Sequence, residues 1–364
     1  MAKHKILIMG AGKIGITVAS LLARTNDYEA YLSDICAPRK LPEISNNPIK
    51  FSVSDITQPQ AIMTFIQENK IDGVISCLPY NLTLEVAKIA AATGIHYFDP
   101  TEDVATTEQV SALATTSRGS FAPQCGLAPG FISIAANSLT ENFESIDHIK
   151  MRVGALTQNV NNNLHYAFTW SIDGVVNEYI HPCVIMADGK PTLAPALEGL
   201  ERLVVDNAHY EAFYTSGGVG SLVESYAGRV KNMDYKTMRY IGHCEKMKFI
   251  LQDLKLREDP ELAKKILTKV IPHNDQDKVV VYVSVLGQKN GMLTEVNYTN
   301  TCLPLQVDNT TFTAIQMTTA AGICTIVDLV VHEKKLSGLI KQEQVSLTEF
   351  LANRFGSYYA QGAK

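Results

Sequence analysis

The sequence lacks the features that mark nucleic-acid-binding and membrane-spanning proteins. Its 364 residues carry 32 Lys and Arg against 37 Asp and Glu, which gives a formal net charge of −5, and no block of basic residues stands out. Because nucleic-acid binding depends on clustered cations that displace counterions, we expect no nucleic-acid partner. No stretch approaches the ~20 apolar residues of a membrane span, so we also expect no membrane association.

Metal-binding and disulfide patterns are missing too. The seven cysteines are scattered, no CxxC pair occurs, and no histidine stands at metal-finger spacing from two of them. We therefore predict no metal site and reduced, mostly buried thiols. The first apolar run, residues 6–9, is too short for a signal peptide and ends in glycines, so we expect a cytoplasmic protein.

The first third of the chain alternates short apolar runs with helical patterns, which is typical of βαβ units in a parallel sheet. Strands are expected at residues 5–9, 29–33, 49–53, 73–77, 96–98 and 120–122. Six strands with intervening helices make a doubly wound sheet. We therefore predict an α/β fold whose N-terminal Rossmann domain covers residues 1–126.

The pattern changes after Gly126, where β-rich segments are joined by longer polar connections. Residues 278–286 and 293–299 flank a turn that contains Asn-Gly, which predicts a hairpin. We predict a second, α+β domain at residues 127–310 that binds the substrate and pairs with a second copy in a homodimer. The remaining residues, 311–364, begin with a long apolar helical pattern and are expected to pack back onto the Rossmann domain.

The strongest local signal is a glycine-rich loop between the first strand and the first helix. Its residues are Gly10, Ala11, Gly12, Lys13, Ile14 and Gly15. At this spacing the first glycine allows the tight turn, the second lets the backbone approach a pyrophosphate, and the third permits close packing of helix and strand. The N-terminus of the helix adds amide groups and a positive dipole for the phosphates.

Asp34 ends the second predicted strand, about 20 residues after the glycines, where a ribose-binding acid is expected. A carboxylate at this position accepts hydrogen bonds from both ribose hydroxyls and repels a 2′-phosphate, which favours NAD as the cofactor. Arg39 and Lys40 follow closely in the chain and leave NADP possible.

Three further loops follow strands at the edge where doubly wound sheets bind ligands. Asp55 follows the third strand and either reaches the adenine side of the cofactor or caps the next helix. The loop after the fourth strand is expected to lie near the nicotinamide end of the cofactor. The loop after the fifth strand begins with another acidic residue. The residues assigned to the cofactor in these two loops are Cys77, Leu78, Pro79 and Asp99.

Several longer segments carry a resemblance to a known family. They are residues 94–99, 126–130, 170–179, 215–218 and 231–243, together with the glycine loop. Over nearly its whole length the chain resembles the saccharopine dehydrogenase-like family, and the run 231–243 most resembles the lysine 6-dehydrogenase group within it. The resemblance implies NAD-dependent oxidative deamination of an amino acid, in which L-lysine loses its ε-amine as ammonia.

The second domain holds the candidate catalytic residues. Arg239 is assigned to the substrate α-carboxylate, because a guanidinium fork matches a carboxylate bidentately. His243 follows four residues later and shares a face with Arg239 if that stretch is helical, as a general base or a substrate ligand. Glu178 and Asp173 are candidates for recognising an amine or placing water, and a solvated strand edge is their alternative.

Two other functions stay open at this point. A saccharopine or carboxy-amine dehydrogenase or reductase that uses NAD(P)H needs a second cation for a second carboxylate. The candidates for that cation are Arg152, Arg202 and Arg229. A non-catalytic dinucleotide-binding sensor would keep the glycine loop and Asp34 but would not depend on Arg239 or His243.

Overall fold

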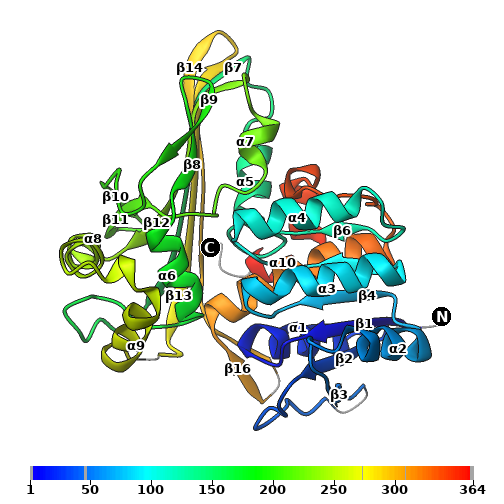
Figure 1. Ribbon diagram of the computed structural model, residues 1–364. Coiled ribbons are helices and arrows are strands. Elements are labelled where there is room, and N and C mark those ends of the chain that lie inside the picture. Colours follow the sequence, from blue (N-terminus) through cyan, green and yellow to red (C-terminus); the bar gives the residue numbers. More distant parts are fainter. Residues whose placement is uncertain (1–2, 45–46, 273, 308, 361–364) are drawn as a thin grey trace. The chain divides into compact units, whose positions relative to one another are not determined.

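The computed structural model describes residues 3–44, 47–272, 274–307 and 309–360. These residues divide into two units, and Figure 1 shows their helices and strands coloured by position along the sequence. Unit 1 contains the described residues of Met1–Phe131 together with Gln316–Ala360, and unit 2 contains those of Ile132–Ile315.

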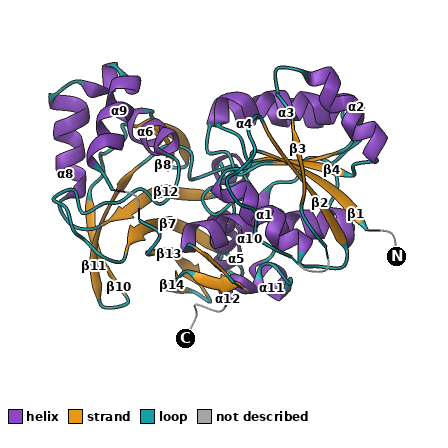
Figure 2. Cartoon of the chain, turned by 90° about the horizontal axis from the view of Figure 1, so that it is seen from below, coloured by secondary structure: helices purple, strands orange, loops and turns teal. Residues whose placement is uncertain are grey.

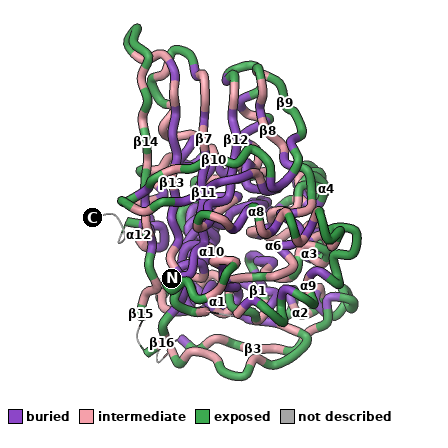
Figure 3. The backbone as a smooth tube through the Cα atoms, turned by 90° about the vertical axis from the view of Figure 1, so that its left-hand side faces the viewer, coloured by how far each residue is buried: buried purple, intermediate pink, exposed green. Residues whose placement is uncertain are grey.

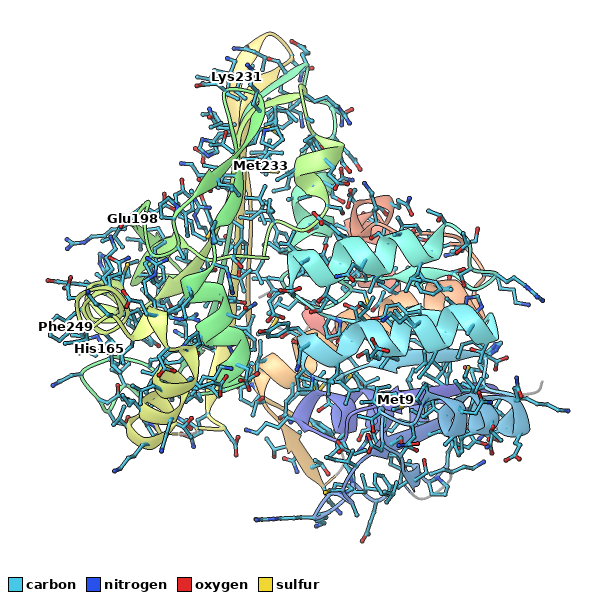
Figure 4. The ribbon with its side chains drawn as sticks, viewed as in Figure 1. Met9, His165, Glu198, Lys231, Met233 and Phe249 are labelled. Carbon is cyan, nitrogen blue, oxygen red and sulfur yellow. The ribbon has the colours of Figure 1, made fainter. Side chains whose placement is uncertain are left out.

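Unit 1 is built on a six-stranded sheet in the order β3-β2-β1-β4-β5-β6, in which every neighbouring pair is parallel. The strands are β1 (His4–Met9), β2 (Tyr28–Asp34), β3 (Lys50–Val53), β4 (Gly73–Ser76), β5 (His96–Phe98) and β6 (Phe121–Ala122). The predicted doubly wound Rossmann sheet is therefore confirmed. Met9, labelled in Figure 4, ends β1 immediately before the glycine loop.

Helices cover both faces of this sheet. Figure 2 shows α2, α3 and α4 on one face and α1 and α10 on the other. The helices of unit 1 are α1 (Lys13–Ala23), α2 (Pro59–Asn69), α3 (Tyr80–Thr93), α4 (Val104–Ala114), α10 (Ala314–Val327), α11 (Leu347–Ala352) and α12 (Ser357–Ala360). Local chemistry sets several of their ends: Pro59 stands in the first turn of α2, Gly94 closes α3 with φ +74°, and Asp103 caps α4 by accepting the Thr106 N–H.

The apolar side chains of α2, α3 and α4 form one core with the sheet. Ile62 and Ile66 of α2 and Val86 of α3 are buried there with Tyr97 and Phe121 of the strands. Burial of side chains of this size stabilises the fold by about 1.5–3 kcal/mol each before conformational entropy is subtracted. This packing fixes the carboxyl edge of the sheet, where the glycine loop begins.

The apolar pattern after residue 311 forms a buried helix. Ala314–His332 is 19 residues long with mean hydropathy 1.7, so it is long and apolar enough to cross a membrane, and the expectation that no such stretch exists was wrong. Its most apolar window is 89% buried inside the protein. Asp328, at its C-terminal end, accepts hydrogen bonds from Tyr28 and Arg354 of the same unit.

Unit 2 is a mixed sheet of eight strands in the order β10-β11-β12-β7-β13-β14, with β8 and β9 attached to β12. The strands are β7 (Ser145–Thr157), β8 (Cys183–Ala187), β9 (Lys190–Ala194), β10 (Glu201–Val205), β11 (Ala208–Tyr214), β12 (Val230–Arg239), β13 (Asp277–Lys289) and β14 (Met292–Cys302). The predicted hairpin is confirmed as β13 and β14, which meet at Asn290 and Gly291, both with positive φ. Lys231 and Met233, labelled in Figure 4, lie on β12.

Burial in this sheet is uneven. Figure 3 shows buried backbone along the central strands β7 and β12 and mostly exposed or half-buried residues along β14. A separate two-stranded sheet of β15 (Leu305–Val307) and β16 (Thr310–Phe312) follows. The helices are α5 (Phe131–Leu139), α6 (Ile172–Ile180), α7 (Leu222–Ser225), α8 (His243–Lys248) and α9 (Pro260–Val270).

The stretch that begins at Trp170 is a helix, so the strand-edge interpretation of its acids was wrong. Ser171 caps α6 by accepting the Gly174 N–H, and the first turn carries Asp173. The far end of the helix is buried in an apolar cluster that includes Val175 and Tyr179. One face of α6 therefore points into the core of unit 2, and Glu178, which is also buried, lies at that end.

Candidate dinucleotide and carboxylate sites

The glycine loop has the geometry that a pyrophosphate requires. Gly10 has φ +107°, and a Cβ on Gly15 would lie 1.8 Å from the Gly10 carbonyl oxygen, so the fold itself requires both glycines. Gly12 differs from them, because a Cβ there would meet nothing within 4 Å. Gly12 also occupies the N-cap position of α1, where it has no side chain to accept from the first amide groups of the helix, which leaves them for a phosphate. The protein alone does not require glycine at position 12, but a closely approaching ligand does.

This difference gives a prediction. Gly12→Ala is expected to fold with nearly wild-type stability but to lose at least about tenfold in dinucleotide affinity, because the new methyl group lies where the pyrophosphate must approach. Gly15→Ala is expected to lose several kcal/mol of stability through overlap with the Gly10 carbonyl. Thermal unfolding combined with calorimetric titration of NAD measures both effects. Equal NAD affinity in Gly12→Ala and the wild type would remove this residue from the cofactor site.

Asp34 lies directly beside the glycine loop. Its Oδ2 accepts the Ala11 N–H at 2.6 Å, and its Oδ1 accepts the Cys36 N–H at 3.4 Å. The carboxylate is half-buried at the end of β2, whereas Arg39 and Lys40 are exposed. The loop, the uncapped helix and this acid together fit a dinucleotide whose ribose lies next to Asp34.

The other predicted cofactor residues have different environments. Asp55 is exposed and accepts the Thr57 N–H at 2.9 Å, while Gln58 takes the N-cap position of α2. The capping role considered for Asp55 was therefore wrong in detail, because its carboxylate closes the turn that precedes the helix. Leu78 packs against the core of unit 1, and Pro79 occupies the N-cap position of α3.

A half-buried thiol, Cys77, and a buried carboxyl group, Asp99, follow strands at the carboxyl edge of the sheet. Burial and the neighbouring Asp99 raise the pKa of the Cys77 thiol to about 12, so this cysteine is a neutral thiol at physiological pH. Asp99 is fully buried and accepts the backbone N–H groups of Thr101 and Gln124. Burial raises the pKa of Asp99 to about 6. Its contacts indicate that Asp99 orders the loops around it.

The sequence interpretation did not select Glu102, which follows β5 in the same loop. Glu102 is half-buried, and its desolvation, together with the charges of Asp103 and Asp99, raises its pKa to about 7. A carboxyl group that titrates near neutral pH is suited to general acid or base catalysis. The only sequence signal was its place in a loop at the carboxyl end of a strand.

Arg239 is the most unusual cation of unit 2. It ends β12 and is only 2% exposed. Its Nε donates to the Tyr179 hydroxyl at 3.0 Å, and its Nη1 donates to the Met238 and Ala155 carbonyls at 3.0 and 3.4 Å. The guanidinium carbon also lies 4.9 Å from the ring centre of Tyr166. Among the residues that the structure describes, no carboxylate forms an ion pair with Arg239.

Arg152, a second buried arginine of the same sheet, differs from Arg239 because it forms ion pairs. It is 1% exposed, and it pairs through Nε with Glu201 and through Nη1 with Asp234. Its charge is therefore balanced by two carboxylates of the protein, which leaves it unsuited to a substrate carboxylate. The other two candidates for a second carboxylate-binding cation are exposed: Arg202 and Arg229.

His243 is close to Arg239, but not through a shared helical face. Residues 240–242 turn the chain after β12, Gly242 has φ +91°, and α8 begins at His243. The imidazole is 1% exposed, its Nδ1 is 2.8 Å from the Leu164 carbonyl oxygen, and its Nε2 is 3.2 Å from the Tyr179 hydroxyl. Burial and the charge of Arg239 lower the pKa of His243 to about 3. This geometry does not favour the predicted general-base role, because both ring nitrogens are engaged and a ring with so low a pKa is a weak proton acceptor.

The two acids of α6 differ in exposure. Asp173 has a half-exposed side chain and pairs with Lys264 at 2.7 Å, which makes it a surface ion pair rather than an amine-binding group. Glu178 is buried and contributes to the electrostatic environment of Arg239. The sequence interpretation missed Tyr179 and Tyr166. Tyr179 lies in a segment that carried the family resemblance, and that was its only signal.

Comparison with known proteins gives the family of the chain. Residues 6–120 match the saccharopine dehydrogenase NADP binding domain, and residues 126–356 match the saccharopine dehydrogenase C-terminal domain. Mouse mitochondrial alpha-aminoadipic semialdehyde synthase is 25% identical over 199 residues, which cover 52% of this chain and 21% of the mouse protein. The match thus spans about a fifth of that relative's length.

Two solved structures share the fold. Apo saccharopine dehydrogenase (L-Glu forming) from Saccharomyces cerevisiae has a TM-score of 0.72 at 14% identity, with 98% of this chain and 96% of that chain covered. The DAP dehydrogenase of C. glutamicum has a TM-score of 0.50 at 12% identity, with 99% of both chains covered. Both domain matches agree with the motifs of the sequence and the Rossmann sheet of unit 1. The chain belongs to the saccharopine dehydrogenase family of NAD(P)-dependent dehydrogenases.

Proposed function

We propose that the protein catalyses the NAD-dependent oxidative deamination of L-lysine at its ε-amine. The observation that carries this proposal is the buried guanidinium of Arg239, which has no carboxylate partner among the described residues. An isolated buried charge is costly unless it is paired. An amino-acid substrate supplies a carboxylate; because Nε and Nη1 are held by Tyr179 and by backbone carbonyls, Nη2 is the nitrogen assigned to it rather than the bidentate fork expected from the sequence.

The proposed reaction converts protonated lysine, NAD⁺ and water into 2-aminoadipate 6-semialdehyde, NADH, ammonium and one proton. When bound, the nicotinamide cofactor supplies the hydride acceptor. The protein contributes position and proton transfer, and in unit 2 Arg239 is assigned to bind the α-carboxylate of the substrate. The ε-amine must lose a proton before its C–H bond is oxidised. The raised pKa of Glu102 in unit 1 suits that carboxylate to general-base catalysis, whereas the low pKa of His243 makes its ring a weak proton acceptor.

This assignment predicts the pH dependence of turnover. The pKa of Glu102 is raised to about 7, and a base acts only when it is deprotonated, so kcat/KM for lysine is expected to rise as pH increases through about 7. Glu102→Gln removes that titration and is expected to lower kcat/KM by about a hundredfold. The matched control is Glu108→Gln, a change in helix α4 of the same unit. A Glu102→Gln enzyme that keeps the wild-type pH profile would exclude Glu102 as the base.

Saccharopine is the alternative substrate, because both matched domains carry the name of its dehydrogenase. Saccharopine carries two carboxylates more than lysine, and Arg152, the buried candidate for binding one of them, is already neutralised by Glu201 and Asp234. Because the charge of Arg152 is already neutralised within the protein, we favour a substrate with one carboxylate.

The proposal is tested by following NADH absorbance with purified protein, NAD or NADP, and a panel of L-lysine, saccharopine and 1,5-diaminopentane. NADH formation with lysine and not with saccharopine supports it. Turnover with saccharopine alone would contradict the proposal and identify the protein as a saccharopine dehydrogenase. If dinucleotide binds but no amine is oxidised, the non-catalytic sensor is favoured.

A further inference from the structure

Tyr179 forms hydrogen bonds with both Arg239 and His243, the two candidate residues that lie four positions apart in the sequence. It lies near the end of α6, it is buried, and its hydroxyl is 3.0 Å from Arg239 Nε and 3.2 Å from His243 Nε2. The three side chains come from a strand and two helices, and their polar atoms form one continuous chain of hydrogen bonds.

The hydrogen bond between His243 and the Leu164 carbonyl fixes the donor and the acceptor of the other hydrogen bonds in this series. His243 Nδ1 faces the Leu164 carbonyl oxygen at 2.8 Å, and a carbonyl oxygen only accepts, so Nδ1 carries the proton. A neutral imidazole protonated on Nδ1 has a lone pair on Nε2. The Tyr179 hydroxyl therefore donates to His243, and its oxygen accepts from Arg239 Nε–H.

This chain and the backbone together fix the orientation of the Arg239 guanidinium. Nε is held by Tyr179, and Nη1 is held by the Met238 and Ala155 carbonyls. The ring of Tyr166, 4.9 Å from the guanidinium carbon, gives a favourable cation–π contact. The hydrogen bonds of the described residues leave Nη2 without a protein acceptor, so the planar group is clamped with one nitrogen unused.

We propose that Tyr179 and His243 are positioning residues for carboxylate binding by Arg239. His243 acts as a fixed acceptor that orients the Tyr179 hydroxyl, and Tyr179 orients the guanidinium. The inference rests on the proposed function only in taking the bound anion to be the α-carboxylate of an amino-acid substrate. It gives the neutral His243 a role that involves no proton transfer.

Kinetics of Tyr179→Phe test this role. Removing a hydrogen bond to a charged group is expected to raise KM for lysine about tenfold with kcat changed less than about twofold. The KM for NAD, and the activity with 1,5-diaminopentane, which has no carboxylate, are expected to stay at wild-type values. His243→Gln, which keeps an acceptor on a side chain of similar length, is expected to retain more of the lysine affinity than His243→Leu.

The control for a general packing defect is Tyr210→Phe. Tyr210 is a buried tyrosine of the same unit whose hydroxyl accepts from Lys278 at 2.9 Å. This variant is expected to leave the KM for lysine unchanged. An equal rise of KM for lysine and 1,5-diaminopentane in Tyr179→Phe, or an unchanged KM for lysine, would overturn the positioning role.

A spectroscopic measurement keeps this test independent of activity. In ¹⁵N spectra of histidine-labelled protein at pH 7, His243 is expected to be neutral with its proton on Nδ1, and its Nε2 signal is expected to shift in Tyr179→Phe. A charged ring, or an Nε2 signal that Tyr179→Phe does not move, overturns the hydrogen-bond chain. If the spectra agree but lysine is not oxidised, the proposed function fails while the hydrogen-bond chain stands.

Discussion

Replacing Arg239 with methionine is expected to lower kcat/KM for lysine by roughly 30- to 5,000-fold. This range corresponds to the loss of about 2–5 kcal/mol when one partner of a buried, hydrogen-bonded charge pair is removed. The affinity for NAD is expected to be unchanged, because the dinucleotide residues belong to unit 1 and Arg239 belongs to unit 2. Steady-state kinetics with lysine and with 1,5-diaminopentane measure the effect, and only the carboxylate-bearing substrate is expected to lose efficiency.

Two further variants test whether the loss of efficiency is specific to the guanidinium of Arg239. Arg239→Lys keeps the charge but loses the planar fork, so it is expected to recover only part of the lost efficiency. Arg202→Met removes an exposed arginine of the same unit and is expected to have little effect. Unfolding in urea shows whether the Arg239 variants remain folded. A folded Arg239→Met enzyme with wild-type kcat/KM for lysine would contradict the assignment of the α-carboxylate.

Replacing Asp34 with asparagine is expected to shift the cofactor preference from NAD towards NADP by about ten- to a hundredfold. Like charges ~4 Å apart repel by about 1 kcal/mol in water and by about 4 kcal/mol near a protein surface, and the 2′-phosphate of NADP would meet the Asp34 carboxylate. Asparagine keeps an oxygen that accepts the Ala11 N–H, so the glycine loop is expected to retain its shape. The ratio of kcat/KM values for the two cofactors measures the shift.

Asp72→Asn is the matched control for the Asp34 variant. Asp72, like Asp34, accepts a backbone N–H, here that of Lys5 in β1 at 2.8 Å, but it precedes β4 and therefore lies at the amino edge of the sheet. Its replacement is expected to leave the cofactor ratio unchanged. A wild-type protein that prefers NADP, as the name of the matched N-terminal domain suggests, would contradict the charge argument for Asp34.

Most of unit 1 was predictable because its signals are local. The helix at Pro59–Asn69 and the strand at His96–Phe98 lie where the sequence placed them, since a proline in the first turn and a glycine after α3 mark the boundaries. Each strand of a parallel sheet is covered on both faces, so it appears in the sequence as a short apolar run.

The strand that carries Arg239 was not predictable in the same way. Asp234, Lys236 and Arg239 of β12 are all buried, so the strand shows no alternation of apolar and polar residues. The charges of Asp234 and Lys236 are balanced by Arg152 of β7 and Glu201 of β10. A pattern of local hydrophobicity does not reveal charges that are neutralised by distant strands.

The sequence by itself determined the Rossmann sheet, the glycine loop and the acid at Asp34, because each depends on residues close together along the chain. Only the tertiary structure decided which buried arginine remains available for a ligand. Arg152 pairs with Asp234 across 82 residues and becomes neutralised, whereas Arg239 forms no ion pair among the described residues and only senses the charge of the buried Glu178. Tyr179 reaches His243 across 64 residues and makes it a fixed acceptor instead of a base. Such pairings depend on how the strands and helices pack, and spacing along the chain does not contain them.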